Sequence, residues 1–297
     1  MIQSGDVDEF SIDLPGGRFH CLREGPADGA LVLCLHGFPD HPPSLAPLMT
    51  RLAAAGYRVV APWMRGYRPS VERGPFHPDR LAVDVLELKH ALSPAAPAHV
   101  VGHDWGAAAT YGALLQTPSA FASAVSMAVP HPIPFLQALG RRPAQLLRSW
   151  YMLFFQLPAL PERVLLGREL AFVDWLWRRW SPGYTLPDDR RRALHACLRT
   201  SLPAPLGYYR AIARPLGTST RRIRRLGEQR VAVPTLHLHG ADDGCIGADI
   251  LGPERRFFER DYRCVVVPDV GHFLQIEAPD VMAGHILDWF AAHPVSR

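Results

Sequence analysis

The stretch "VVGHDWGAAA", residues 100–109, decides how the rest of the chain is interpreted. Two valines lead into Gly102-His103-Asp104-Trp105-Gly106, in which small residues flank an acidic centre, and alanines follow. Valine favours a strand and alanine favours a helix, while paired glycines permit a tight turn between them. The stretch therefore predicts a strand, a sharp turn and a helix, with the side chain of Asp104 presented at the turn.

Length and composition limit the class of protein. The 297 residues are 48% hydrophobic and 20% charged, which is typical of a globular protein with a large core. No run of 18 apolar residues occurs, so no transmembrane helix is predicted. The first ten residues, "MIQSGDVDEF", are polar and acidic, unlike a secretory signal. We therefore expect a cytoplasmic protein.

The cysteines give no sign of a disulfide framework or a zinc site. They are odd in number, scattered, and without CxxC spacing. The five are Cys21, Cys34, Cys197, Cys245 and Cys264. We expect free thiols and no bound metal.

Positive charge is concentrated in one part of the chain. Residues 131–228 hold 17 arginines and six acidic residues, although the whole chain has a net charge of only +4. No aromatic-interleaved basic motif accompanies these arginines, so nucleic-acid binding is not predicted. Ordinary solvated helix faces are the favoured explanation for the charge, and whether this basic segment has a separate role stays open.

Strand and helix patterns alternate along both ends of the chain. Two β-prone runs, residues 9–14 and 17–24, flank Pro15-Gly16-Gly17 and predict a hairpin. Residues 30–40, "ALVLCLHGFPD", form an apolar run typical of a strand buried on both faces. Later strands are predicted at 57–63, 98–103, 121–129, 231–240 and within 262–273, with helices at 45–52, 79–92, 105–116 and the C-terminus. This alternation predicts a mostly parallel sheet with helices on both faces.

The pattern changes at Pro130. From there to about residue 228, Trp, Arg and Leu recur at helical spacing and no strand pattern is convincing. We predict a core domain formed by residues 1–129 and 229–297, and an inserted all-helical lid formed by residues 130–228.

Four motifs follow one another, each at the predicted carboxyl end of a strand. The order of acidic nucleophile, second acid and histidine is that of catalytic triads on this kind of sheet. The motifs are His36-Gly37-Phe38-Pro39, the turn at Asp104, Gly240-Ala241-Asp242-Asp243 and Gly271-His272-Phe273.

Taken together, these motifs resemble the α/β-hydrolase superfamily, and within it the epoxide hydrolases and the related haloalkane dehalogenases. The resemblance covers nearly the whole chain, including the lid, and both families carry an aspartate at the turn, commonly in G-x-D-W-G. It implies an α/β-hydrolase fold and no cofactor.

A carboxylate suits attack on a saturated carbon better than attack on an acyl group. It is ionised near pH 7, needs no base to attack, and forms a stable alkyl ester. That ester must then be hydrolysed by water, which requires a base and an oxyanion hole. We therefore predict Asp104 as nucleophile and His272 as base, and the resemblance implies the backbone N–H groups of Phe38 and Trp105 as oxyanion donors.

The remaining site residues are less sharply defined. The G-x-x-D pattern of the family selects Asp243 as the acid that partners His272, and the adjacent Asp242 is the alternative. Substrate contacts are expected from His36, Pro39 and the side chain of Trp105, with His36 also orienting the oxyanion loop.

Two lid tyrosines separate the candidate substrates. Epoxide opening produces an alkoxide that needs a proton donor, and a phenol with a pKa near 10 fits that task. The segments "SWYMLFFQ" and "GYYRAI" resemble the family's lid tyrosine segments and select Tyr151 and Tyr209. A dehalogenase would instead need two N–H donors for a halide, for which Trp105, Trp175 and Trp177 are candidates.

We therefore expect an epoxide hydrolase that detoxifies a small, largely apolar epoxide. A haloalkane dehalogenase is the first alternative, and a non-catalytic ligand-binding protein on the same fold is the second. Neither the physiological substrate nor the oligomeric state follows from the sequence.

Overall fold

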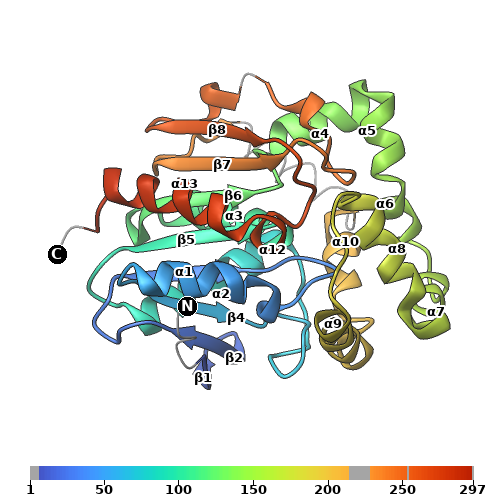
Figure 1. The fold of residues 1–297 in the computed structure, drawn as a ribbon, viewed down its shortest axis with the longest axis horizontal. Coiled ribbons are helices and arrows are strands. Elements are labelled where there is room, and N and C mark those ends of the chain that lie inside the picture. The colour runs from blue at the N-terminus through green and yellow to red at the C-terminus, as the bar shows by residue number, and fades with distance from the viewer. Residues whose placement is uncertain (1–6, 214–227, 253, 296–297) are drawn as a thin grey trace.

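The computed structural model describes residues 7–213, 228–252 and 254–295. Its centre is one eight-stranded sheet with the order β1-β2-β4-β3-β5-β6-β7-β8 (Figure 1). The strands are β1 (Asp8–Leu14), β2 (Gly17–Glu24), β3 (Leu31–Leu35), β4 (Arg58–Pro62), β5 (Ala98–His103), β6 (Phe121–Met127), β7 (Thr235–Gly240) and β8 (Tyr262–Val267).

The sheet is mostly parallel, as predicted. Strands β3 to β8 pair in parallel, whereas β1 and β2 form the predicted antiparallel hairpin and β2 pairs antiparallel to β4. Every residue of β3, β5 and β7 is buried, because helices cover both faces of these central strands.

The helices that flank the sheet also match the predicted pattern. They are α1 (Ala46–Ala54), α2 (Pro78–Leu92), α3 (Trp105–Gln116), α12 (Leu274–Glu277) and α13 (Pro279–Ala292). Helix α1 packs against α13, and α2 packs against α3, which gives two helical layers around the sheet. The apolar stripe of α13 faces the core through Met282, Ile286, Trp289 and Phe290.

Between β6 and β7 the described residues form helices and contain no named strand. These helices are α4 (Pro132–Arg141), α5 (Pro143–Arg148), α6 (Trp150–Phe154), α7 (Leu160–Leu166), α8 (Ala171–Trp180), α9 (Asp188–Ser201) and α10 (Leu206–Ala213). Residues 214–227 of the predicted lid lie outside the described residues, and the lid boundaries remain a prediction. We refer to α4–α10 as the lid helices.

The lid helices lie together at one end of the sheet (Figure 1). That end carries the loops that follow β3, β5 and β7, where the predicted site motifs begin. Within the described residues, no helix has the length and apolar character needed to cross a bilayer.

Candidate active site

The turn after β5 holds Asp104 in a strained conformation. Its φ of 51° and ψ of −117° lie outside the usual regions for a non-glycine residue, and such strain is commonly found at functional sites. Gly102 and Gly106 make the turn possible. A Cβ at Gly102 would lie 2.5 Å from the carbonyl oxygen of Gly106, and one at Gly106 would lie 2.3 Å from that of Leu35.

The carboxylate of Asp104 meets the loop that follows β3. The backbone N–H of Phe38 donates a hydrogen bond of 2.8 Å to Asp104 Oδ1. Trp105 begins α3 directly after Asp104, so its N–H belongs to the first helical turn and has no intrahelical partner. Of the two predicted oxyanion donors, the Phe38 N–H thus binds this carboxylate directly, whereas the Trp105 N–H is the next backbone N–H along the chain.

Buried hydrogen bonds fix the shape of this loop. Both ring nitrogens of His36 form hydrogen bonds with the backbone. Nδ1 bonds to the carbonyl oxygen of Gly37 at 2.9 Å, and Nε2 accepts from the N–H of Met64 at 3.1 Å. The Tyr67 hydroxyl donates to the same Gly37 oxygen at 2.9 Å. Burial lowers the pKa of His36 to about 4, so this ring is neutral at pH 7. His36 thus braces the loop and has no ring nitrogen left for a substrate.

Pro39, another predicted substrate contact, is joined to the lid. Its carbonyl oxygen accepts a hydrogen bond of 2.8 Å from the indole Nε1 of Trp177 on α8. The Trp177 ring stacks on Phe273, with 3.4 Å between ring centroids. The loop containing Phe38 is therefore held from the lid side as well.

His272 lies between two carboxylates. Its Nδ1 is 2.8 Å from Asp243 Oδ2, and its Nε2 is 3.7 Å from Asp104 Oδ2. Nε2 is buried and has no hydrogen-bond partner among the described residues. The ring is therefore oriented by Asp243 and presents toward Asp104 a nitrogen whose hydrogen-bonding capacity is unused.

Asp243 and its neighbour differ in environment. Asp243 is buried, and its Oδ1 accepts from the N–H groups of Cys245 at 2.7 Å and Ile246 at 2.8 Å. Burial opposes its charge, but His272 outweighs that effect and lowers the pKa of Asp243. Asp242 is exposed. The geometry thus brings Asp243, and not Asp242, to His272.

The same carboxylates alter the titration of His272. Burial favours the neutral ring, but the negative charges of Asp243 and Asp104 outweigh it and raise the pKa of His272 to about 10. The ring is therefore cationic at pH 7. Loss of either negative charge would lower this pKa.

The two lid tyrosines lie next to each other near Asp104. Tyr151 on α6 and Tyr209 on α10 are both buried, with 5.8 Å between ring centroids, and Tyr209 meets the Trp105 ring edge-on at 5.0 Å. Burial, with the charge of Asp104 adding to it, raises the pKa of both tyrosines. Both hydroxyls are therefore protonated at neutral pH.

The two hydroxyls are not equivalent. The Tyr151 hydroxyl lies 3.2 Å from Cys245 Sγ. The Tyr209 hydroxyl is buried without a hydrogen-bond partner among the described residues. Neighbouring Tyr208 differs again, because its hydroxyl donates to the carbonyl oxygen of Arg65. Tyr209 is thus the one of the three whose hydroxyl is left available.

The end of α8 contacts the loops that carry Asp243 and His272. The Trp180 carbonyl oxygen accepts from the N–H groups of Gly244 and His272, each at 3.1 Å. Ser181 Oγ lies 2.9 Å from the N of His272 and donates to Glu277, which also accepts from the N–H of Gly271. The lid thereby holds the backbone on which His272 is carried.

Sequence reasoning did not identify Cys245, Ser181 or Glu277 as part of the site. Cys245 follows the acid by two positions, and that proximity was the only signal available. Asp243, Cys245 and His272 could in principle reach one metal ion, since their ligand atoms lie within 4.8 Å of one another. However, burial and the charge of Asp243 raise the pKa of the Cys245 thiol, whereas a metal ligand must be a thiolate. The donor set therefore fits a metal poorly.

Comparison with known proteins identifies the family of this chain. A model of the alpha/beta hydrolase fold family matches residues 30–279. Human epoxide hydrolase 4 is 27% identical over 277 residues, covering 90% of this chain and 74% of that protein. Epoxide hydrolase A of Mycobacterium tuberculosis (strain ATCC 25618 / H37Rv) is 27% identical over 329 residues, covering 96% and 98%. The crystal structure of epoxide hydrolase A from Mycobacterium thermoresistibile superimposes with a TM-score of 0.81 at 24% identity, covering 98% of this chain and 100% of that chain, which supports the fold.

Proposed function

This chain belongs to the alpha/beta hydrolase fold family, and from that premise we propose that it is an epoxide hydrolase that converts an epoxide and water to a vicinal diol. The observation that carries the proposal is the strained Asp104 carboxylate, with His272 beside it and two buried, protonated lid tyrosines close by. Relatives named epoxide hydrolases, similar to this chain over 90% or more of its length, support the same activity.

In the first step Asp104 Oδ2 attacks an epoxide carbon. A carbon–oxygen bond to the enzyme forms, the epoxide carbon–oxygen bond breaks, and the electron pair moves onto the departing oxygen. Tyr209 supplies the proton to that oxygen, because its hydroxyl has no other partner. Its raised pKa keeps it protonated until an alkoxide, a much stronger base, develops.

In the second step water attacks the carbonyl carbon of the new ester. Asp104 Oδ1, which accepts from the Phe38 N–H, becomes the oxyanion and is stabilised by that donor. His272 Nε2 takes one proton of the water, the bond to the alkyl oxygen breaks, and that oxygen leaves with the second proton of the water as the diol. The proton that His272 loses after esterification returns through solvent to the Tyr209 phenolate left by the first step. Asp104 is regenerated as a carboxylate.

The change in charge at Asp104 explains how His272 can act as a base. While Asp104 is ionised, it helps to raise the pKa of His272 to about 10. Esterification removes that negative charge, so the pKa of His272 falls and the ring loses its proton more readily. Alkylation should therefore depend little on pH between 6 and 9, whereas ester hydrolysis should accelerate as the pH rises. Single-turnover measurements of the two steps test this.

The geometry favours an epoxide over a haloalkane. Trp177 Nε1 already donates to Pro39, and Trp175 is partly exposed to solvent on the outer side of α8. Two candidate halide donors named by the sequence are thus unsuited to a buried halide. The linked pair of Asp243 and His272 likewise argues against a purely ligand-binding protein.

Intact-mass spectrometry of the His272→Gln variant with styrene oxide tests the proposal. We expect a mass increase equal to one styrene oxide, because alkylation proceeds without the base and hydrolysis does not. Asp104→Asn/His272→Gln is the control and should show no increase. Absence of the adduct in His272→Gln, together with halide release from chloroalkanes by the parent protein, would replace this proposal with the dehalogenase alternative.

A further inference from the structure

The lid exposes an unusual number of large apolar side chains. Of the eleven exposed large hydrophobic residues among the described residues, eight lie between positions 146 and 175. Leu147 and Leu153 are the most exposed, at 74% and 68%. We call these eight residues the lid patch: Leu146, Leu147, Trp150, Leu153, Leu157, Leu160, Leu166 and Trp175. A concentration of this kind marks an interaction surface, whereas single exposed apolar residues do not.

Ring contacts connect α6 to α8 within the lid patch. Trp150 lies 6.3 Å from Trp175 and 6.2 Å from Phe172, and Phe172 stacks on Trp175 at 5.5 Å between centroids. Helix α5 contacts α6, and α7 contacts α8. Figure 1 shows α5, α7 and α8 along the edge of the molecule farthest from the sheet. The patch is thus presented outward by four neighbouring helices.

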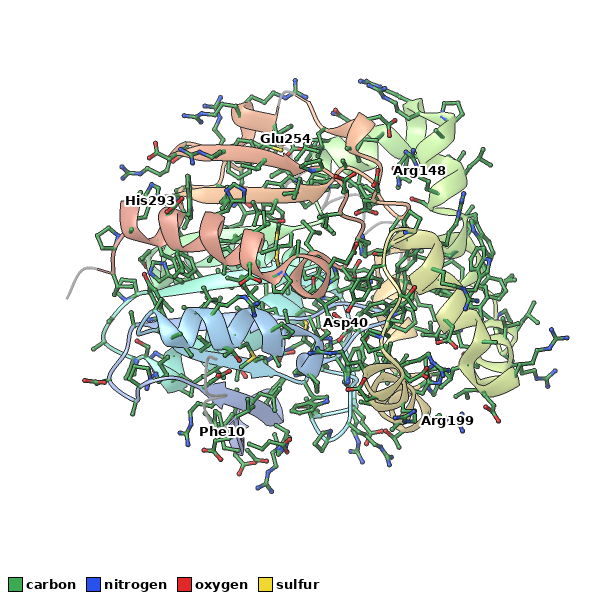
Figure 2. The ribbon with its side chains drawn as sticks, in the orientation of Figure 1. Phe10, Asp40, Arg148, Arg199, Glu254 and His293 are labelled. Atoms are coloured by element: carbon green, nitrogen blue, oxygen red, sulfur yellow. The ribbon has the colours of Figure 1, made fainter. Side chains whose placement is uncertain are left out.

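Arginines accompany the lid patch. Residues 141–180 contain seven arginines and three acidic residues. Arg148, which bonds Asp249, lies at the α5 end of this edge (Figure 2). The other six are exposed and form no ion pair with another described residue: Arg141, Arg142, Arg163, Arg168, Arg178 and Arg179. Excess positive charge disfavours a second copy of the same face and favours an anionic partner.

We infer that the lid patch docks onto an anionic lipid membrane surface. Leucines that insert into the acyl region, tryptophans at the headgroup level and arginines that meet lipid phosphates are the features of helices lying in a membrane interface. Docking through α5–α8 is a property separate from the proposed reaction, because it needs no chemistry at Asp104.

The opposite faces of the same helices contact the active site. On α5, Gln145 is buried and donates to the carbonyl oxygen of Cys245 at 3.0 Å, whereas Leu146 and Leu147 point outward. On α6, Tyr151 is buried at the site, whereas Trp150 and Leu153 are exposed. If the proposed function holds, a docked lid would place the site directly beside a bilayer that dissolves apolar epoxides.

Vesicle co-sedimentation of the full chain tests the docking. We compare vesicles of pure phosphatidylcholine with vesicles containing 30% phosphatidylglycerol (about the anionic content needed for strong attraction), in low and in about 0.15 M salt. The apolar variant is Leu147→Gln/Leu153→Gln, and the charge variant is Arg141→Gln/Arg142→Gln. Val266→Gln/Val281→Gln, at the two exposed core valines with 45% and 46% exposure, is the matched control.

We expect the parent protein to bind the anionic vesicles more tightly than pure phosphatidylcholine vesicles, and to bind them more weakly in about 0.15 M salt than in low salt. Each arginine removed should weaken binding about fivefold, so the charge variant should bind about 25-fold more weakly. The apolar variant should bind at least about tenfold more weakly, and the core valine control should bind as the parent does. Circular dichroism checks that all variants are folded.

Two results would overturn the inference. One is equal affinity of the parent and the apolar variant for anionic vesicles. The other is a parent protein that does not bind vesicles but is a dimer by light scattering, while the Leu147→Gln/Leu153→Gln variant is a monomer. The lid patch would then be a contact between two copies of the chain. Binding is measured without substrate, so neither result depends on whether the proposed reaction is correct.

Discussion

The core and the lid use their polar and apolar groups in opposite ways. In the core loops, Asp104, Asp243 and His272 are buried, and most of their hydrogen-bonding atoms have partners in the backbone or in one another. In the lid, apolar side chains such as Leu147 and Leu153 are exposed instead. The core therefore fixes charges at defined distances, which a reaction centre requires.

This difference predicts which property of the protein a substitution in each region should change. Changes in the core loops should remove chemistry, changes on the inner face of the lid should slow one step, and changes on its outer face should alter location only. The following predictions test that division.

The largest effect is expected at the core acids. Asp104→Asn and Asp243→Asn should each lower kcat for styrene oxide by about 10⁴-fold or more, because the nucleophile or the orienting acid is lost. Steady-state diol formation measures this. The exposed neighbour provides the control, and Asp242→Asn should retain activity. Full activity of Asp243→Asn together with loss in Asp242→Asn would reverse the assignment of the triad acid.

The inner face of the lid should produce a smaller, step-specific effect. Tyr209→Phe should slow alkylation by about 10²-fold, and Tyr151→Phe should slow it less, because the Tyr151 hydroxyl already bonds to Cys245. The double variant should lose up to about 10⁴-fold, with ester hydrolysis nearly unchanged. Stopped-flow alkylation rates measure this. Tyr208→Phe is the matched control, and an equal slowing by Tyr208→Phe would show that the effect is structural.

Acid sensitivity should come from buried histidines of the core. Burial lowers the pKa of His99 to about 4, whereas the unfolded value is near 6.5. The unfolded chain therefore binds the extra proton, and stability falls as the pH drops from 6.5 toward 4. Between pH 7.5 and 5 this group should cost about 2 kcal/mol of unfolding free energy.

Urea unfolding at the two pH values measures that loss. His99→Gln should reduce the pH dependence by about the same 2 kcal/mol, and the exposed His90→Gln should leave it as in the parent protein. An unchanged pH dependence in His99→Gln would assign the acid sensitivity elsewhere.

The smallest effect on catalysis is expected where the lid meets the core. Ser181→Ala removes the hydroxyl that lies beside the N–H of His272 and donates to Glu277, so kcat should fall about tenfold and stability by about 1–3 kcal/mol. Ser181→Thr should restore part of both, and the exposed Ser119→Ala should change neither. A fall in stability with no fall in kcat would limit Ser181 to a structural role.

Much of the core could be predicted from the sequence because its signals are local. The hairpin at residues 15–17 and the strand–turn–helix around Asp104 depend on neighbours in the chain, and both are confirmed. The boundaries of β5 and α3 agree with the predicted 98–103 and 105–116.

The site could be predicted only in part, because its remaining contacts join distant segments. The contact between Tyr151 and Cys245 spans 94 residues, and that between Ser181 and His272 spans 91. Helical spacing predicted lid helices, yet it could not reveal that Leu147 and Leu153 face outward, since an apolar stripe is ordinarily assigned to the core.

The junction at Trp180 and Ser181 has a consequence for attempts to exchange lids between related proteins. Two glycines allow the end of α8 to approach the two loops closely. A Cβ at Gly244 would lie 2.0 Å from the Arg179 carbonyl oxygen, and one at Gly271 would lie 2.5 Å from Ser181 Cα. A grafted lid must therefore bring its own carbonyl and hydroxyl to the same two loops, and the recipient must offer glycine at both positions. Chimeras that join at Pro130 and residue 229 will keep His272 aligned only when donor and recipient both have these backbone contacts and both glycines.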